Sequence, residues 1–230
     1  MMTRPVRFAS RRAAGAQLAR RLLHCRAHNP LVLALPRGGV PVGVEIARAL
    51  EAPLDMLIVR KVSAPGGEEF AIGALAEGNP PELFIDSDLR AALSVPGGYI
   101  EDASAAAARE IERRRLVYRG GRAMPPVAGR WVVLVDDGIA TGATMQAAVR
   151  ALKRLGPERV ILAVPVAAAD ALARLQPEVD EIACLRQATD LHAVGQFYLD
   201  FAQLEDAEVC ADLAAAAAFG GGFDESKITR

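Results

Sequence analysis

The sequence predicts an α/β fold: a doubly wound, mainly parallel five-stranded sheet with flanking helices. Five short apolar segments alternate along the chain with segments of helical periodicity, the pattern of parallel strands joined by crossover helices. Hydrophobic residues make up 52% of the 230 residues and aromatic residues only 5%, so the core consists mainly of Val, Leu, Ile and Ala. A chain of this length suits one such domain with elaborations, or at most two small domains.

The first segment, residues 4–26, is rich in arginine and contains no acidic residue, as is typical of targeting peptides. However, Ala14, Leu18 and Leu22 repeat at four-residue spacing and form one apolar stripe. We therefore predict that this is the first helix of the domain, capped by Ser10, rather than a targeting peptide. No hydrophobic run is long enough for a secretory signal or a membrane span, so we expect a cytoplasmic protein with no membrane partner.

Residues 31–35 form the first predicted strand, and the sequence P-R-G-G-V-P-V-G at 36–43 follows as a strand-to-helix junction. Arg37 places one cation beside Gly38 and Gly39, where the bare backbone allows a ligand to approach closely. This arrangement fits a pyrophosphate. An ordinary glycine turn with a solvated arginine is the alternative.

Residues 54–62 form the second predicted strand, which ends in Arg60 and Lys61. A Pro- and Gly-containing segment follows at 63–70. Two cations at a strand end beside such a loop indicate an anion contact next to a mobile lid that carries Glu68, Glu69 and Phe70. Solvated surface charges are the alternative for the two cations.

A small hairpin is predicted from residues 71–76 and 83–86, followed by a brief helix capped by Asp86 or Ser87. A long helix at 100–118 then carries the densest positive cluster of the chain. We interpret the cluster as a solvated basic face, with a substrate- or RNA-facing patch as the alternative. The net charge is only −1, so we expect no nucleic-acid partner. The cluster consists of Arg109, Arg113, Arg114, Arg115 and Arg119.

The third strand leads into the most informative segment, V-V-L-V-D-D-G-I-A-T-G-A-T at residues 132–144. Ligands of parallel sheets bind beyond the carboxyl ends of the strands, where Asp136 and Asp137 lie. The small residues that follow leave backbone N–H groups open to an anion at the start of the next helix, and Thr141 and Thr144 add hydroxyl donors. A fitting ligand carries a phosphate at one end and hydroxyls or a hydrated divalent cation at the other, as a ribose 5-phosphate does.

The remaining segments complete the predicted sheet. A helix after Thr144 ends at a Gly-Pro pair, and strands follow at 159–167 and 181–185, separated by a short helix that Asp170 caps. Residues 193–201 then contain the only aromatic cluster of the chain.

The segment 132–144 resembles the phosphoribosyl diphosphate (PRPP) motif of the type I phosphoribosyltransferases, and the resemblance covers most of residues 8–206. In that family the two acids hold the ribose 2- and 3-hydroxyls, and the loop after them wraps the 5-phosphate. The loop after the first core strand binds pyrophosphate and often contains a cis non-proline peptide. This sequence departs from the usual motif at Gly138, where a bulky residue is common.

The resemblance implies an enzyme that transfers the 5-phosphoribosyl group from PRPP to a small-molecule acceptor and releases pyrophosphate. A nucleobase is one candidate acceptor, as in nucleotide metabolism, and Mg²⁺ is the implied cofactor, held by Asp136 and Asp137 mainly through the ligand. The implied catalytic residues are Asp136, Asp137, Arg37 and Lys61. The implied binding residues are Gly38, Gly39, Arg60, Gly138, Ile139, Ala140, Thr141, Gly142, Ala143, Thr144, Phe197 and Tyr198.

The domain is predicted to span residues 1–212, with a helical insertion at about 87–122 and a hood at about 186–206, before a flexible tail at 213–230. In the hypoxanthine-type members of the family, the segment after the last strand forms a hood over the acceptor. A planar acceptor could therefore stack on Phe197 or Tyr198, but packing of these rings in a satellite core is an equal alternative.

Two other functions remain open. One is a PRPP-sensing regulator that binds RNA or DNA through the basic helix, and the other is nucleotide phosphorolysis or hydrolysis on the same fold.

Three widely spaced cysteines give neither a disulfide framework nor a zinc site and indicate a reducing compartment. The sequence does not fix the oligomeric state, and a homodimer is one option. The cysteines are Cys25, Cys184 and Cys210.

Overall fold

The computed structural model describes residues 7–66, 71–78, 80–191 and 193–219. The predicted lid residues Glu68, Glu69 and Phe70 lie outside the described residues.

The predicted five-stranded parallel sheet is confirmed. Its order is β2-β1-β6-β7-β8, and every pair is parallel. From β1 the chain moves outward to β2, and the later strands add on the other side of β1, so the strand order reverses between β1 and β6. Ligands of doubly wound sheets bind at such a reversal. The strands are β1 (Leu31–Ala34), β2 (Leu54–Met56), β6 (Trp131–Val135), β7 (Arg159–Ala168) and β8 (Glu181–Ala188).

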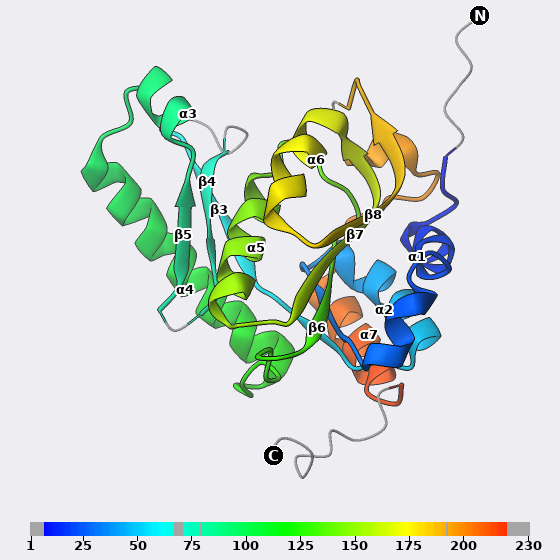
Figure 1. The fold of residues 1–230 in the computed structure, drawn as a ribbon. Coiled ribbons are helices and arrows are strands. Elements are labelled where there is room, and N and C mark those ends of the chain that lie inside the picture. The colour runs from blue at the N-terminus through cyan, green and yellow to red at the C-terminus, as the bar shows by residue number, and fades with distance from the viewer. Residues whose placement is uncertain (1–6, 67–70, 79, 192, 220–230) are drawn as a thin grey trace, which may run out of the picture.

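Helices cover both faces of this sheet, because alternate side chains of each buried strand point to opposite faces (Figure 1). Leu134 of β6 packs in the cluster that α5 and α6 cover, whereas Val133 packs in the cluster of α1 and α2. The helices are α1 (Arg11–Ala19), α2 (Gly39–Leu50), α5 (Ala143–Arg154) and α6 (Ala169–Leu175), with short 3-10 turns at Leu23–His28, Gln176–Glu178 and Val194–Phe197.

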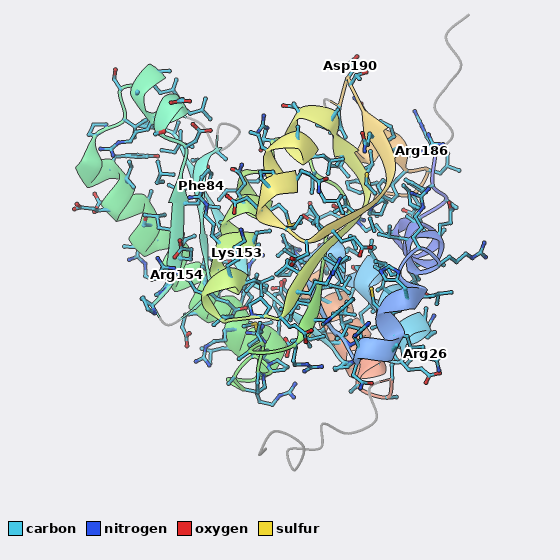
Figure 2. All side chains as sticks on the ribbon, viewed as in Figure 1. Arg26, Phe84, Lys153, Arg154, Arg186 and Asp190 are labelled. Atoms are coloured by element: carbon cyan, nitrogen blue, oxygen red, sulfur yellow. The ribbon has the colours of Figure 1, made fainter. Side chains whose placement is uncertain are left out.

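A second, antiparallel sheet of three strands lies between α5 and the long helix α4 (Figure 1). Its strand β5 contacts α5, where Arg154 Nε lies 2.8 Å from the Glu82 carboxylate and Arg150 stacks over the Phe84 ring. Figure 2 labels Phe84 of β5 and Arg154 of α5. The elements are β3 (Val59–Ser63), β4 (Ala71–Ala76), β5 (Glu82–Ile85), α3 (Ser87–Ala92) and α4 (Gly97–Arg119).

The prediction of one strand over residues 54–62 is wrong. The segment is divided into β2 and β3, which belong to different sheets. Leu57 N still donates to Ala34 O of the parallel sheet at 3.1 Å, but Ile58 N donates to the Glu77 carboxylate at 2.7 Å. Because the backbone finds partners in both sheets, the chain crosses between them without a glycine or proline.

The interpretation of the arginine cluster as a solvated face is wrong for two of its members. Arg119 is 4% exposed and forms ion pairs with Asp55 and Glu77 at 2.7 Å each, which join α4 to β2 and to the residue after β4. Arg114 is 8% exposed and pairs with Glu110.

The two ends of the domain differ in how well they were predicted. Ser10 caps α1 as expected, since its Oγ accepts a hydrogen bond from Ala13 N at 3.2 Å, and the apolar stripe of this helix is buried. In contrast, Asp170 lies in the first turn of α6 rather than at its cap. The tail does not begin at 213, because helix α7 (Asp206–Ala216) continues beyond that point and buries Val209 and Ala216. No helix within the described residues is long and apolar enough to cross a membrane.

Candidate functional site

The two aspartates lie where the prediction placed them, directly after β6 and beside the end of β1. Leu35 N donates to Val135 O at 2.8 Å, so the two strands stay paired up to the point where their loops diverge. Asp137 N donates to the Asp136 carboxylate at 2.8 Å, and the Asp137 side chain is 14% exposed. The switch point between β1 and β6 is therefore lined by a pair of adjacent carboxylates.

The environment of this pair favours proton retention. Desolvation, followed by repulsion from Asp137, raises the pKa of Asp136 well above its ordinary value of 3.8, although Lys61 and Arg11 oppose the shift. Desolvation also raises the pKa of Asp137, and the hydrogen bond from Arg11 opposes it. A cationic or hydroxyl-bearing ligand that contacted both carboxylates would favour their ionised forms.

Arg11 is a site residue that the sequence did not reveal. Its Nε donates to Asp137 Oδ2 at 2.7 Å, and its side chain is only 12% exposed. A second nitrogen donates to Ala202 O at 2.9 Å, and the guanidinium stacks 3.7 Å from the centre of the Phe201 ring. The partners lie 126 and 191 residues away in the sequence, so only the fold brings them to Arg11.

The β6–α5 loop, residues 136–144, has the geometry of an anion site. Gly142 has a φ of +84° and stands at the N-cap of α5, where it has no side chain to accept hydrogen bonds from the first-turn amides of the helix. Ile139 anchors the loop, because its N–H donates to Val166 O at 3.0 Å and its carbonyl accepts from Ala168 N at 2.8 Å. At Gly138 a Cβ atom would lie 2.5 Å from Val194 Cγ1, which explains why no bulky residue stands there.

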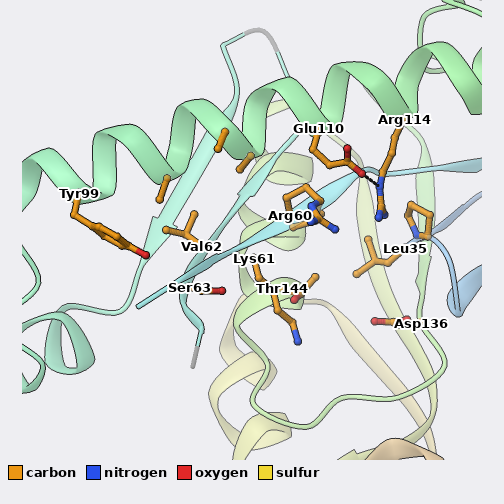
Figure 3. A pocket seen from close by; sticks show the side chains of 15 residues that line it. Leu35, Arg60, Lys61, Val62, Ser63, Tyr99, Glu110, Arg114, Asp136 and Thr144 are labelled. Atoms are coloured by element: carbon orange, nitrogen blue, oxygen red, sulfur yellow. Dashed lines mark hydrogen bonds and ion pairs between the residues drawn. The ribbon is translucent and has the colours of Figure 1, made fainter. Parts of the chain in front are cut away.

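Two adjoining cavities open at this loop. The smaller, of about 230 Å³, is lined by Lys61, residues 136–142, Thr144, Met145 and Val194. The larger, of about 620 Å³, lies between β3 and α4 and is also lined by Arg60 (Figure 3). Both are lined by Lys61, Asp136 and Thr144, so these three residues stand between the two cavities.

The loop after β1 agrees with the resemblance in its backbone but not in its arginine side chain. The peptide bond between Pro36 and Arg37 is cis, and Gly38 lies against the Asp137 carboxylate, with Gly39 against the Val135 carbonyl. The Arg37 side chain, however, lines neither cavity. It donates to the Leu204 carbonyl, and its Nε lies 3.8 Å from Asp206.

Phe197 and Tyr198 lie in a satellite core with Phe8 and are only 8% and 2% exposed. This supports the core-packing alternative over stacking of an acceptor on either ring. Tyr198 still touches the site, because its hydroxyl donates to the Asp137 carbonyl at 2.6 Å.

Comparisons with known proteins agree with this geometry. The model of the phosphoribosyl transferase domain matches residues 9–202. Proteins from two strains of Mycobacterium tuberculosis, provisionally named phosphoribosyl transferases, are 42% identical over 211 residues, which are 90% of this chain and 46% of each relative. The chain thus spans about half the length of these curated relatives.

A solved structure has a similar fold and sequence. The crystal structure of TT1426 from Thermus thermophilus superposes with a TM-score of 0.76 at 43% sequence identity and covers 94% of this chain and all of its own. The match of the domain model over most of the chain, together with these relatives, shows that the chain belongs to the phosphoribosyltransferase family.

Proposed function

We propose that this chain is a Mg²⁺-dependent phosphoribosyltransferase that transfers the 5-phosphoribosyl group of PRPP to a nucleophilic small-molecule acceptor and releases pyrophosphate. One observation carries the proposal: the acid pair, Lys61 and the start of α5 line the same cavity. That space offers carboxylates for sugar hydroxyls, open amides for a phosphate and a cation for a diphosphate.

Each part of PRPP has a matching part of the cavity. The 5-phosphate would accept hydrogen bonds from the amides and threonine hydroxyls of residues 140–144, since the Ile139 N–H already donates to Val166 O. Asp136 and Asp137, once ionised, would accept hydrogen bonds from the ribose 2- and 3-hydroxyls. Lys61, with the backbone of Arg37 and Gly38, would stabilise the diphosphate. Arg11 would keep Asp137 ionised and oriented, since it donates to one of the two carboxylate oxygens.

The donor set fits Mg²⁺ as an ion shared with the ligand. The part of the chain that the structure describes contains no group of three or more His, Cys, Asp or Glu side chains that could hold a metal alone. Asp136 and Asp137 supply hard oxygen donors, which suit Mg²⁺ when substrate oxygens complete its shell. Bound in this way, Mg²⁺ would neutralise charge on the diphosphate.

The transfer forms one bond and breaks one. A lone pair of the acceptor forms a bond to ribose C1, the bond from C1 to the diphosphate oxygen breaks, and its electron pair leaves with pyrophosphate. A proton on the attacking atom passes to water. Because the transition state resembles an oxocarbenium ion, the protein contributes mainly by positioning the sugar and stabilising the leaving charge.

The test measures pyrophosphate release and does not require the acceptor to be known in advance. The protein is incubated with PRPP and Mg²⁺ in the presence of purines, pyrimidines and other small nucleophiles, and pyrophosphate release is followed by phosphorus NMR. We expect release that depends on an acceptor, with a new phosphoribosyl product. Failure to bind PRPP in a calorimeter with Mg²⁺ present would overturn the proposal.

The regulatory alternative has no specific support. Its basic helix offers fewer free charges than the sequence indicated, because Arg114 and Arg119 are buried in ion pairs and Arg113 and Arg115 each pair with a neighbouring glutamate. Phosphorolysis or hydrolysis would be recognised in the same NMR experiment from its products. A cytoplasmic location remains part of our proposal.

A further inference from the structure

The larger cavity has more room than the proposed PRPP contacts use. Its volume of about 620 Å³ lies within the range of about 300–1,000 Å³ that is common for small-molecule sites. Lys61, Asp136 and Thr144 line the end where the proposed sugar would bind, while residues of α4 line another side. A diphosphate alone would leave this helical side uncovered.

The side of the cavity on α4, which we call the α4 wall, is apolar in its middle and charged toward the sugar. The apolar part consists of Ala103, Ala106 and Ala107, whose methyl groups leave room for a flat ring against the helix. The charged part consists of Glu110 and Arg114, whose side chains point from α4 toward the cavity (Figure 3). The wall therefore has an apolar surface and a polar end.

Arg114 is the group on this wall that has hydrogen-bond donors available for an anion. Its side chain is 9% exposed, and its Nε donates to Glu110 Oε1 at 2.8 Å. Among the described residues this is its only hydrogen-bond partner, so the four N–H donors of its terminal nitrogens have no protein acceptor. These terminal nitrogens are not among the buried unpaired atoms of the described residues, so they face the open cavity, where an anion would supply acceptors for them.

The charge of Glu110 does not cancel this preference. Arg113 donates to both of its carboxylate oxygens, at 2.8 and 3.0 Å, and Arg114 donates to one of them. These bonds lower the pKa of Glu110 to about 2, so its carboxylate stays ionised. Its oxygens already accept hydrogen bonds from the two arginines. Arg60 and Lys61 add two further cations to the lining.

We propose that the α4 wall is the acceptor site, and that the acceptor is a planar molecule bearing a carboxylate or another anionic group that binds Arg114. This inference rests on the proposed function, because the ring would lie over the alanine stretch beside the sugar. Arginine side chains on helices lean toward the N-terminus, which directs Arg114 toward that stretch. The helical insertion, rather than the predicted hood around Phe197 and Tyr198, thus selects the acceptor.

The experiment compares pairs of planar acceptors in which one member is an anion and the other is a neutral analogue. Wild-type protein is supplied with PRPP, Mg²⁺ and one of three pairs: nicotinate and nicotinamide, 2-aminobenzoate and 2-aminobenzamide, or orotate and uracil. Both acceptor binding and pyrophosphate release are measured. In at least one pair we expect the anion to be preferred by about 10- to 100-fold, the effect of one charged hydrogen bond.

Two variants connect this preference to the wall. Arg114→Gln should abolish the preference for the anion and leave the Kd for PRPP unchanged. Arg113→Gln is the matched control, because Arg113 contacts the same glutamate but is half exposed and lines neither of the two cavities at the site, so the preference should persist. Ala106→Phe, at an exposed position, should block the cavity and prevent acceptor turnover without weakening the binding of PRPP.

The outcomes separate this inference from the proposed function. If the wild type fails to bind PRPP, the proposed function itself is wrong. If PRPP binds but no anion of the three pairs binds or is preferred, the anionic acceptor is wrong. If Arg114→Gln weakens the binding of PRPP rather than the binding of the acceptor, Arg114 binds the diphosphate and the inference fails. Should that variant not fold, Ala106→Phe decides, because unimpaired acceptor turnover would exclude the α4 wall.

Discussion

The two sides of the proposed substrate cavity are built in opposite ways. The β6–α5 loop supplies two carboxylates, open amides and two threonines within nine consecutive residues at the end of one strand. The α4 wall is placed by contacts between distant segments, since Arg119 joins α4 to Asp55 and Glu77, which are 64 and 42 residues away. The first side is thus determined by local sequence, and the second by long-range packing and ion pairing.

This difference predicts where substitutions act. Changes in the loop should affect ligand binding first, because its groups line the cavity, although Asp137 also forms an ion pair with Arg11. Changes in the ion pairs under the α4 wall should affect stability first, because unpaired buried charges are costly. The following predictions test that division, from the largest expected effect to the smallest.

The largest effect should come from Asp136→Asn combined with Asp137→Asn. Each carboxylate would lose a charged hydrogen bond to the sugar worth about 1.5–3 kcal/mol, so PRPP binding should weaken by about 3–6 kcal/mol in total. Calorimetry with Mg²⁺ measures the loss. Asp170→Asn, at an exposed carboxylate on α6, is the control and should bind PRPP normally. Equal binding by the double variant and the control would contradict the assignment of the loop.

Arg119→Met should act on stability instead. It leaves Asp55 and Glu77 without their buried partner, which should lower the free energy of unfolding by about 3–5 kcal/mol. Urea unfolding measures the change. Arg115→Met removes a more exposed pair with Glu112 and should cost less than about 1 kcal/mol. Similar costs for the two variants would show that the α4 wall does not depend on the buried pairs.

Arg11→Gln should change the pH dependence of PRPP binding. The pKa of Asp137 is already raised above 3.8 by desolvation, and loss of the Arg11 hydrogen bond should raise it further. Because binding needs the ionised carboxylate, affinity rises as pH increases through this pKa. The midpoint of that rise should therefore move upward, by about one pH unit for each 1.36 kcal/mol of lost interaction. A titration of Kd between acidic and alkaline pH measures the midpoint, and a downward shift would contradict this role.

Tyr198→Phe should have the smallest effect. It removes one hydrogen bond to the Asp137 carbonyl but keeps the ring, so stability should fall by about 0.5–1.5 kcal/mol. Acceptor preference should not change, because the ring lies in the satellite core. A changed order of acceptor rates in this variant would favour the hood as the acceptor site instead.

The sequence was sufficient where local chemistry decides the structure. Continuous apolar runs identified the parallel strands, and the loop that starts at Asp136 was located from its residue types alone. Arg11 could not be found in this way, because nothing near it in the sequence marks its contact with Asp137. Arg119 was misjudged for a related reason: a basic residue at a helix end is usually solvated, and its buried partners lie on other segments. The crossing from β2 to β3 was missed because both sheets accept the same extended, apolar chain.

The short segment 204–206 joins the loop after β1 to helix α4. The Leu204 carbonyl accepts a hydrogen bond from Arg37 on the loop after β1, while Asp206 accepts one from Tyr118 of α4 and lies 3.5 Å from Arg113. A chain cut before this tripeptide would lose its ties to the β1 loop and to α4 together. Deletions or reporter fusions at the carboxyl end therefore need to keep every residue through α7 if activity is to be measured.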